Sequence, residues 1–254
     1  MDTSAHEAVR GGFVSSVIYA WQCGMEGGSA LARLAFGDTD FSSALAVTSY
    51  FDNYTNFVAI DNIALENRGY RFIADESFVY RPFGFAGSYS SWASPVISLL
   101  QPSSGLLSVN RSNAKSEINV SVTIDMQRQR SPSGRSDHLS VSRPLLCFLS
   151  RKPEKHAEQG NASRTPRYGP WPQRWLVAYT KVHQIDALSA GVGDSSHAVA
   201  TLSFGAEAFE RWNADTQRLE VVEGDYEISS VDTAGSPVGA ISLTLTLEDR
   251  EMHG

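Results

Sequence analysis

Cysteine is nearly absent from this 254-residue chain, and its scarcity excludes two ways of stabilising a fold. The chain contains only Cys23 and Cys147, with no C-x-x-C pair and no histidine cluster beside either residue. A disulfide framework needs several cysteines, and a thiolate zinc site needs closely spaced cysteines and histidines. One isolated disulfide between the two residues is left open, and we expect no metal and no cofactor.

Long apolar runs and an excess of basic charge are missing as well. The longest apolar run, Phe13 to Trp21, is interrupted by two serines, whereas a helix that spans a bilayer needs about 20 apolar residues. The chain has 21 Lys and Arg against 28 Asp and Glu, so its formal net charge is -7. A field of that sign repels phosphate backbones and acidic lipid surfaces. We therefore expect neither nucleic acid nor a membrane as a partner.

Targeting signals conflict. The first residues lack the basic region and the small-residue cleavage site of a signal peptide. Four N-x-S/T sequons, at Asn53, Asn110, Asn119 and Asn161, are in contrast typical of secreted proteins. The sequence therefore leaves the compartment open.

The part of the chain before residue 50 has the pattern of one αβ unit. Residues 12–21 are rich in β-branched and aromatic types and are followed by Gly24, which predicts a buried strand and a tight turn. Ser29 to Phe36 contains strong helix formers, and Gly37 supplies a stop. A single unit cannot cover both faces of a parallel sheet, so its partners must come from elsewhere.

Two further regions follow. Between residues 41 and 94 short apolar stretches alternate with Gly, Asn, Asp and many aromatic residues, which predicts an ordered arm packed across a neighbouring surface. Beyond it, alternating apolar and polar residues predict antiparallel strands over Ile118–Ile124, Leu145–Leu149, Trp175–Val182, Ala198–Phe204 and Ile241–Leu247. Turn clusters separate these segments, and no helical pattern lies between them, which favours an antiparallel β-sandwich.

Side chains that could carry chemistry are few. Glu26 lies in a glycine-rich turn at a predicted helix N-terminus, where it is either a capping carboxylate or a contact to a sugar. Asp38 and Asp40 are expected to end the helix and form a turn. Trp171, in the proline-rich segment 151–172 that we expect to be an exposed loop, could stack on a sugar ring. No spacing indicates a metal site.

Four segments, in this order, resemble the C-terminal portion of glycoside hydrolase family 3, the β-glucosidases and β-xylosidases. Residues 20–38, Ala-Trp-Gln-Cys-Gly to Phe-Gly-Asp, are similar to the end of the family's α/β sandwich domain. Arg68-Gly-Tyr-Arg-Phe72 with the segment 80–89 is similar to the stretch that leaves that domain. Residues 176–183, and 209–212 with 221–228, resemble the family's fibronectin type III-like domain.

The resemblance implies a mainly β fold, a fibronectin type III-like antiparallel β-sandwich preceded by a truncated remnant of an α/β sandwich domain. The expected division is a remnant at 1–50, an aromatic arm at 51–94, and the sandwich at 95–254 with its insertion at 151–172. It also implies that Trp212 packs in the sandwich core. Members of the family hydrolyse terminal β-linked xylose or glucose, and many are secreted.

The family's two catalytic carboxyl groups lie in regions that precede the part matched here, so no catalytic residue is assigned. Cleavage of a glycosidic bond needs two carboxyl groups about 5 to 9 Å apart. We therefore expect this chain alone to be non-catalytic. Two alternatives remain: a stand-alone carbohydrate-binding or protein-interaction module, or a half-enzyme completed by a separate barrel chain. The expected partners are thus a β-linked oligosaccharide or a barrel domain.

Overall fold

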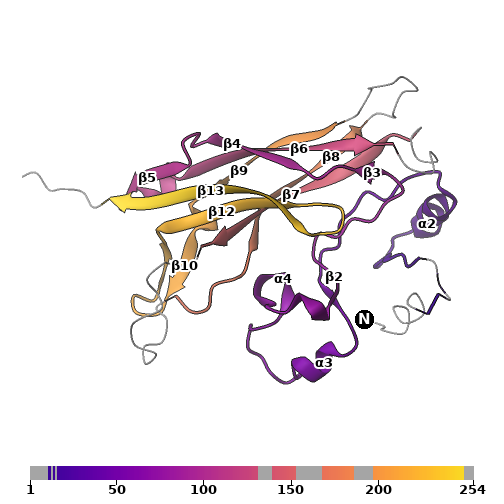
Figure 1. Ribbon diagram of the computed structural model, residues 1–254, viewed down its shortest axis with the longest axis horizontal. Coiled ribbons are helices and arrows are strands. Elements are labelled where there is room, and N and C mark those ends of the chain that lie inside the picture. The colour runs from indigo at the N-terminus through magenta and orange to yellow at the C-terminus, as the bar shows by residue number, and fades with distance from the viewer. Residues whose placement is uncertain are drawn as a thin grey trace, which may run out of the picture.

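The computed structural model describes residues 11–12, 14, 16–130, 139–152, 168–185 and 197–248. The fold is dominated by a β-sandwich, with an irregular region and one longer helix beside it (Figure 1). Among the described residues no helix has the length and apolar character needed to cross a membrane. The mainly β fold expected from the sequence is confirmed.

Two sheets form the sandwich. The first has the strand order β5-β13-β12-β7-β8, and in the second β6 pairs with β9 and with β3 and β4. All of these pairs are antiparallel except β13 with β5. The bounds are β3 Ser91–Trp92, β4 Val96–Gln101, β5 Leu106–Asn110, β6 Asn119–Gln129, β7 Val141–Arg151, β8 Trp175–Ile185, β9 His197–Gly205, β12 Gly224–Val231 and β13 Pro237–Glu248. Four of the five predicted strands lie within one of these elements, and the fifth, 118–124, lies in β6 except for its first residue, Ile118.

The core between the sheets follows the predicted alternation. Along β6, Val120, Val122 and Ile124 are completely buried, as expected for the apolar face of a strand of period two. Phe209 and Tyr226 fill the end of the core, with ring centroids 5.0 Å apart. The short elements near this end are α5 Ala114–Glu117, η2 Ala206–Ala208 and the hairpin of β10 Glu210–Asn213 with β11 Arg218–Val221.

Strand β7 is buried on both faces. Leu145, Cys147 and Leu149 point into the core between the sheets. Leu146 and Phe148, on the other face, form a second cluster with Val231, against which Tyr70 and Phe83 of the aromatic arm pack. The ring of Phe148 lies edge-on to both aromatic rings, at 5.9 Å and 6.0 Å. The predicted packing of the arm across a neighbouring surface is therefore confirmed.

The aromatic arm, residues 51–94, consists mainly of turns and short elements. These are α3 Tyr54–Phe57, α4 Gly69–Phe72, η1 Glu76–Phe78 and β2 Val79–Arg81, which pairs with β1 Ser49–Tyr50 just before the arm. Ring stacks hold it together, among them Phe57 on Phe78 at 4.4 Å. Burial raises the pKa of Tyr50 to about 12, and its hydroxyl accepts a hydrogen bond from the backbone of Gly69.

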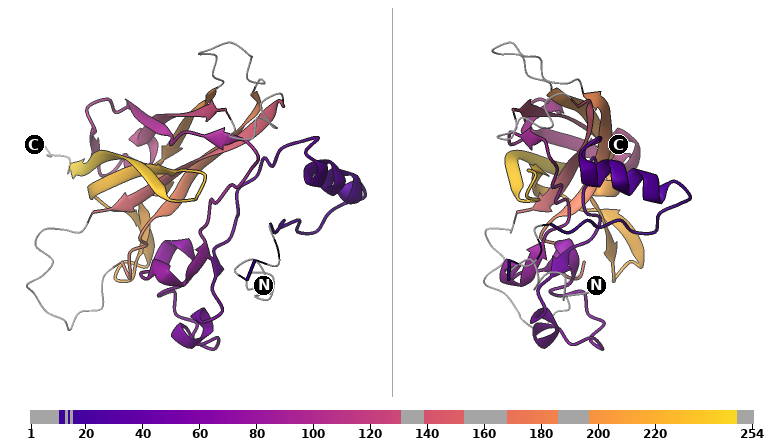
Figure 2. Two further views of the ribbon diagram at one scale, coloured as in Figure 1. Left: turned by 45° about the vertical axis from the view of Figure 1, so that its right-hand side comes forward. Right: turned by 90° about the vertical axis from the view of Figure 1, so that its right-hand side faces the viewer.

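The N-terminal αβ unit is confirmed only in its helix. Helix α2 spans Gly27–Phe36 and ends at Gly37, whose φ of 80° is a left-handed conformation that suits glycine. The predicted buried strand is wrong: among the described residues of 12–21 none lies in a strand, and Ile18 and Trp21 are 40% and 65% exposed. A strand needs neighbours for its backbone groups, and no described strand pairs with this segment. Figure 2 shows α2 standing away from the sandwich.

The segment 151–172 differs in part from the exposed loop that its composition predicts. Residues 153–167 lie outside the described residues. At its ends, however, Arg151 closes β7, Trp171 is half-buried and Pro172 is buried. The ends of the segment are therefore packed against the sandwich, because Arg151 and Arg211 both approach the Trp171 ring.

Candidate functional site

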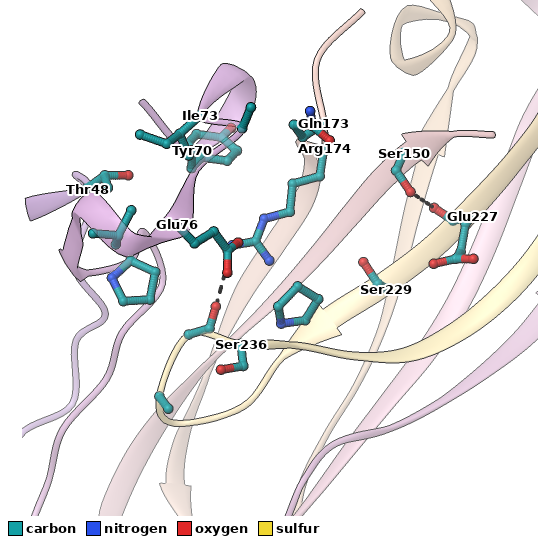
Figure 3. A pocket seen from close by; sticks show the side chains of 16 residues that line it. Thr48, Tyr70, Ile73, Glu76, Ser150, Gln173, Arg174, Glu227, Ser229 and Ser236 are labelled. Atoms are coloured by element: carbon teal, nitrogen blue, oxygen red, sulfur yellow. Dashed lines mark hydrogen bonds between the residues drawn. The ribbon is translucent and has the colours of Figure 1, made fainter. Parts of the chain in front are cut away.

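A pocket of about 490 Å³ lies where the aromatic arm meets the sandwich (Figure 3). One wall comes from Thr48 and from residues 70–82, and the other from Ser150, residues 173–174 and residues 227–237. We call it the arm pocket. Its size is in the range of small-ligand sites, which run from about 300 to 1,000 Å³. Five stretches that are distant in sequence build it, so no local sequence motif identifies it.

Local geometry brings the two walls together. In the arm, Asp75 caps η1 by accepting a hydrogen bond from the backbone N–H of Ser77 at 2.9 Å, and bonds from Ser77 lower the pKa of the Asp75 carboxyl. In the sandwich, the β12–β13 turn contains Gly235 with a φ of 79°. A Cβ at this position would lie 2.6 Å from Pro82 Cγ, so only glycine lets the turn approach the arm this closely.

Arg174 is the cation of the arm pocket. Its guanidinium lies 5.1 Å from the ring centroid of Phe148, and its Nη2 donates a long hydrogen bond of 3.5 Å to the carbonyl of Gly235. Burial lowers the pKa of this guanidinium, and the nearby Glu76 carboxylate opposes that effect. Its Nη1 is buried and has no hydrogen-bond partner. Leaving such a donor unpaired costs about 1 to 3 kcal/mol.

Two carboxyl groups border the same space. Glu76 extends from η1 toward the Arg174 guanidinium, and Glu227 lies on β12 on the opposite side of Arg174 in Figure 3. Lys152 Nζ lies 3.9 Å from Glu227 Oε2. One guanidinium and two carboxylates therefore border the same pocket, and Glu76 is the carboxylate close to Arg174. Sequence reasoning missed all three residues.

The sequence-predicted site residues lie elsewhere. Glu26 occupies the N-cap position of α2, but its side chain makes no capping hydrogen bond, so the expected capping role is wrong. It is exposed and is not part of the arm pocket. Trp171 is also outside the pocket, and the guanidinium groups of Arg151 and Arg211 lie 4.5 Å and 4.9 Å from its ring centroid. Two guanidinium groups therefore already lie over the Trp171 ring, which the sequence suggested as a stacking surface for a sugar. A substrate contact by either residue stays a prediction.

Two further expectations need correction. Asp40 does not simply form a turn: it is 9% exposed and accepts hydrogen bonds from the backbone N–H groups of Tyr89 and Ser90, at 2.8 Å and 3.0 Å, and from the Ser90 hydroxyl. Trp212 is 52% exposed and does not pack in the core. The turn η2 directs Phe209 inward instead, and the alternation of β10 then places Trp212 outward.

The two cysteines are free. Cys23 is exposed, and Cys147 is buried in β7, so the disulfide that the sequence left open is not formed. Burial raises the pKa of the Cys147 thiol to about 12. Among the residues that the structure describes, no group of three His, Cys, Asp or Glu side chains could hold a metal ion.

Comparisons with known proteins give a sequence match over part of this chain and structural matches over most of it. No family model matches the chain. A xylan 1,4-beta-xylosidase from Xylanibacter ruminicola is 32% identical over 77 residues, which are 30% of this chain and 8% of that protein.

The structural matches are broader. A GH3 beta-glucosidase from Bifidobacterium adolescentis covers 92% of this chain with a TM-score of 0.60 and 20% identity, and the match takes up 31% of that protein. A beta-D-glucoside glucohydrolase from Trichoderma reesei covers 87% with a TM-score of 0.58 and 15% identity, over 29% of its own length. A beta-glucosidase from Streptomyces venezuelae, solved with D-glucose, covers 86% with a TM-score of 0.54 and 19% identity, over 24% of its length.

This chain therefore spans less than a third of the length of each of these relatives. At such identities the likeness concerns the fold. Together with the order of the sequence motifs, it confirms the resemblance of this chain to the C-terminal portion of glycoside hydrolase family 3.

Proposed function

We propose that this chain acts as the C-terminal portion of a family 3 glycosidase that hydrolyses terminal β-linked xylose or glucose. In this proposal the chemistry is carried by a barrel and an α/β sandwich domain, and the part described here packs against them. The structural matches to beta-glucosidases over most of this chain support the proposal.

One observation carries it. The segment 16–36 has the composition of a buried strand and an amphipathic helix, yet Ile18, Trp21 and Phe36 are 40%, 65% and 86% exposed. Several large apolar side chains left exposed in one short segment are typical of a surface that another protein surface covers. A sheet neighbour for residues 16–22 would cover it, which is what an α/β sandwich domain supplies.

The test compares the chain alone with two other forms. One is extended by the residues that an in-frame reading upstream of Met1 encodes, and the other is the chain mixed with the product of a neighbouring gene. We expect no turnover of 4-nitrophenyl β-D-xylopyranoside or β-D-glucopyranoside by the 254-residue chain, and turnover by the extended or combined protein. Trp21→Asp should abolish the gain. Trp212→Asp, a change at another exposed tryptophan on the far hairpin, is the matched control and should leave it intact.

Two results would contradict the proposal. One is a genome with no barrel encoded in frame with this chain or next to it. The other is turnover by the chain alone that disappears in both Glu76→Gln and Glu227→Gln, because the two carboxyl groups of the arm pocket would then form a catalytic pair.

A further inference from the structure

We propose that Arg71 of the aromatic arm and Arg211 of the sandwich form a binding site for a small oxyanion, a phosphate or carboxylate group, at the segment 170–173. Neither arginine lines the arm pocket, and the inference does not depend on the glycosidase activity proposed above. It rests on where the two guanidinium groups are held, on the lack of a counter-charge, and on how a ligand can reach them.

The segment 170–173 brings the two arginines together from different parts of the fold. Arg71 lies in α4, and its backbone carbonyl accepts a hydrogen bond from the N–H of Gln173 at 2.5 Å. Arg211 lies in β10. Its Nη2 donates to the carbonyl of Pro170 at 2.7 Å, and its guanidinium lies 4.9 Å from the ring centroid of Trp171. A cation of the arm therefore lies near a cation of the sandwich.

The two guanidinium groups act on each other as like charges. Burial lowers the pKa of Arg211, and the charge of Arg71 lowers it further. Neither arginine forms an ion pair with a carboxylate in the part of the chain that the structure describes. The face of the Trp171 ring attracts Arg211, but the ring carries no net charge. The two positive charges are therefore not neutralised by the described chain.

A ligand can reach both side chains. Arg71 is exposed and Arg211 is half-buried. The Nε of Arg211 is buried, so a ligand would contact this guanidinium through its Nη atoms. A half-buried cation is screened less by water than an exposed one, so an anion beside it gains more electrostatic energy.

The chemistry of guanidinium selects an oxyanion. Its planar fork of N–H donors matches two oxygen atoms of one carboxylate or phosphate group, whereas a halide offers a single atom. A doubly charged anion would also offset both cations at once. The chain as a whole has a formal net charge of -7 and repels anions, so we expect binding to be confined to this segment.

Binding by both arginines has a consequence for stability, because one of them belongs to the arm and the other to the sandwich. A ligand that prefers the docked arrangement stabilises it by mass action. Without the ligand, the repulsion between the two cations opposes docking. We therefore expect Arg71→Met to leave the melting temperature in chloride unchanged or to raise it, and to remove the additional stabilisation that phosphate gives.

The experiment is a titration of the ¹⁵N-labelled 254-residue chain with inorganic phosphate and with succinate at about pH 7.5, followed by NMR. Sodium chloride keeps the ionic strength constant. We expect shifts confined to residues 69–73, 170–173 and 210–212, with a Kd of about 1 mM for at least one anion. Arg71→Met and Arg211→Met should each weaken binding about tenfold. Tighter binding of phosphate or of succinate shows which oxyanion the site prefers.

The matched control is Arg33→Met, which removes an exposed cation from α2 and should leave the Kd unchanged. Arg71→Lys, which keeps the charge but loses the planar fork, should weaken binding less than Arg71→Met. Because Arg71 is exposed, its variants test the inference even if Arg211→Met does not fold.

Three results would overturn the inference. The first is that phosphate and succinate give no shifts beyond those of chloride at the same ionic strength. The second is a Kd that Arg71→Met leaves unchanged. The third is an equal loss of binding in Arg33→Met, because the anion would then respond only to the total charge of the chain.

Discussion

The sandwich and the segment 16–36 are both rich in large apolar side chains, but these side chains are buried in the sandwich and exposed in the segment. In β6 and β7 such residues are almost completely buried, between the sheets and beneath the aromatic arm. In the segment 16–36 Trp21, Met25 and Phe36 face outward. The difference teaches that an apolar pattern specifies a surface to be covered. The helix α2 forms without that cover, because its backbone hydrogen bonds are internal, whereas the strand predicted at 12–21 needs a neighbouring strand and does not form.

The sharpest contrast concerns the two cysteines, one in each region. Burial raises the pKa of Cys147 to about 12, so at pH 8 its thiolate fraction should be about a thousandfold below that of an ordinary thiol. We expect one thiol, Cys23, to react with a thiol reagent in the native chain, and two in denaturant. Mass spectrometry of the modified peptides checks this. Equal reaction at both sites would show that β7 is not protected.

A second contrast is between two large aromatic side chains. Phe209 is 1% exposed and contacts the rings of Phe204 and Tyr226, so Phe209→Ala should lower the free energy of unfolding by about 3 to 5 kcal/mol. Trp21→Ala, at a 65% exposed position, should change it by less than about 0.5 kcal/mol. Denaturant unfolding followed by circular dichroism measures both. A large loss for Trp21→Ala would mean that the segment is already covered.

The third and smallest contrast concerns the junction between the two regions, at Asp40. Asp40→Ala would leave the backbone N–H groups of Tyr89 and Ser90 without their acceptor, at a cost of about 1 to 3 kcal/mol. We expect faster hydrogen exchange at these two amides, while those of Val122 and Ile124 in β6 keep their protection. Uniform loss of protection would indicate that Asp40 supports the whole fold instead of this junction.

The sequence predicts most reliably those features that depend on the residues of a single strand or helix. The alternation in Val120, Val122 and Ile124 predicts both the strand and its buried face, and the Phe36-Gly37 sequence predicts the end of α2. The prediction of a buried strand at 12–21 was wrong. Such a strand needs a neighbouring strand, and no strand in the described part of the chain pairs with this segment. The prediction that Trp212 packs in the core was also wrong. After η2, Phe209 enters the core, and Trp212 in the following strand faces outward.

The candidate site could hardly be predicted. Its walls come from stretches around residues 76, 174 and 227, and nothing in their local sequences links them. The only early signal was in β7, where five consecutive apolar residues, Leu145 to Leu149, exceed what a strand with one solvent face needs. Such a run predicts a cover on the outer face, and the aromatic arm is that cover.

Because β7 is buried on both faces, the sandwich cannot be transferred to another protein by recombination without exposing apolar side chains. A recombination event that transferred residues 95–254 alone would carry Leu146 and Phe148 into the new protein with their outer face stripped. It would also lose Asp40, which accepts hydrogen bonds from the backbone of Tyr89 and Ser90 in the arm, and Gly84, where the arm backbone lies close to the side chains of Leu146 and Val231. A transferred sandwich would therefore need the aromatic arm with it to keep the outer face of β7 covered.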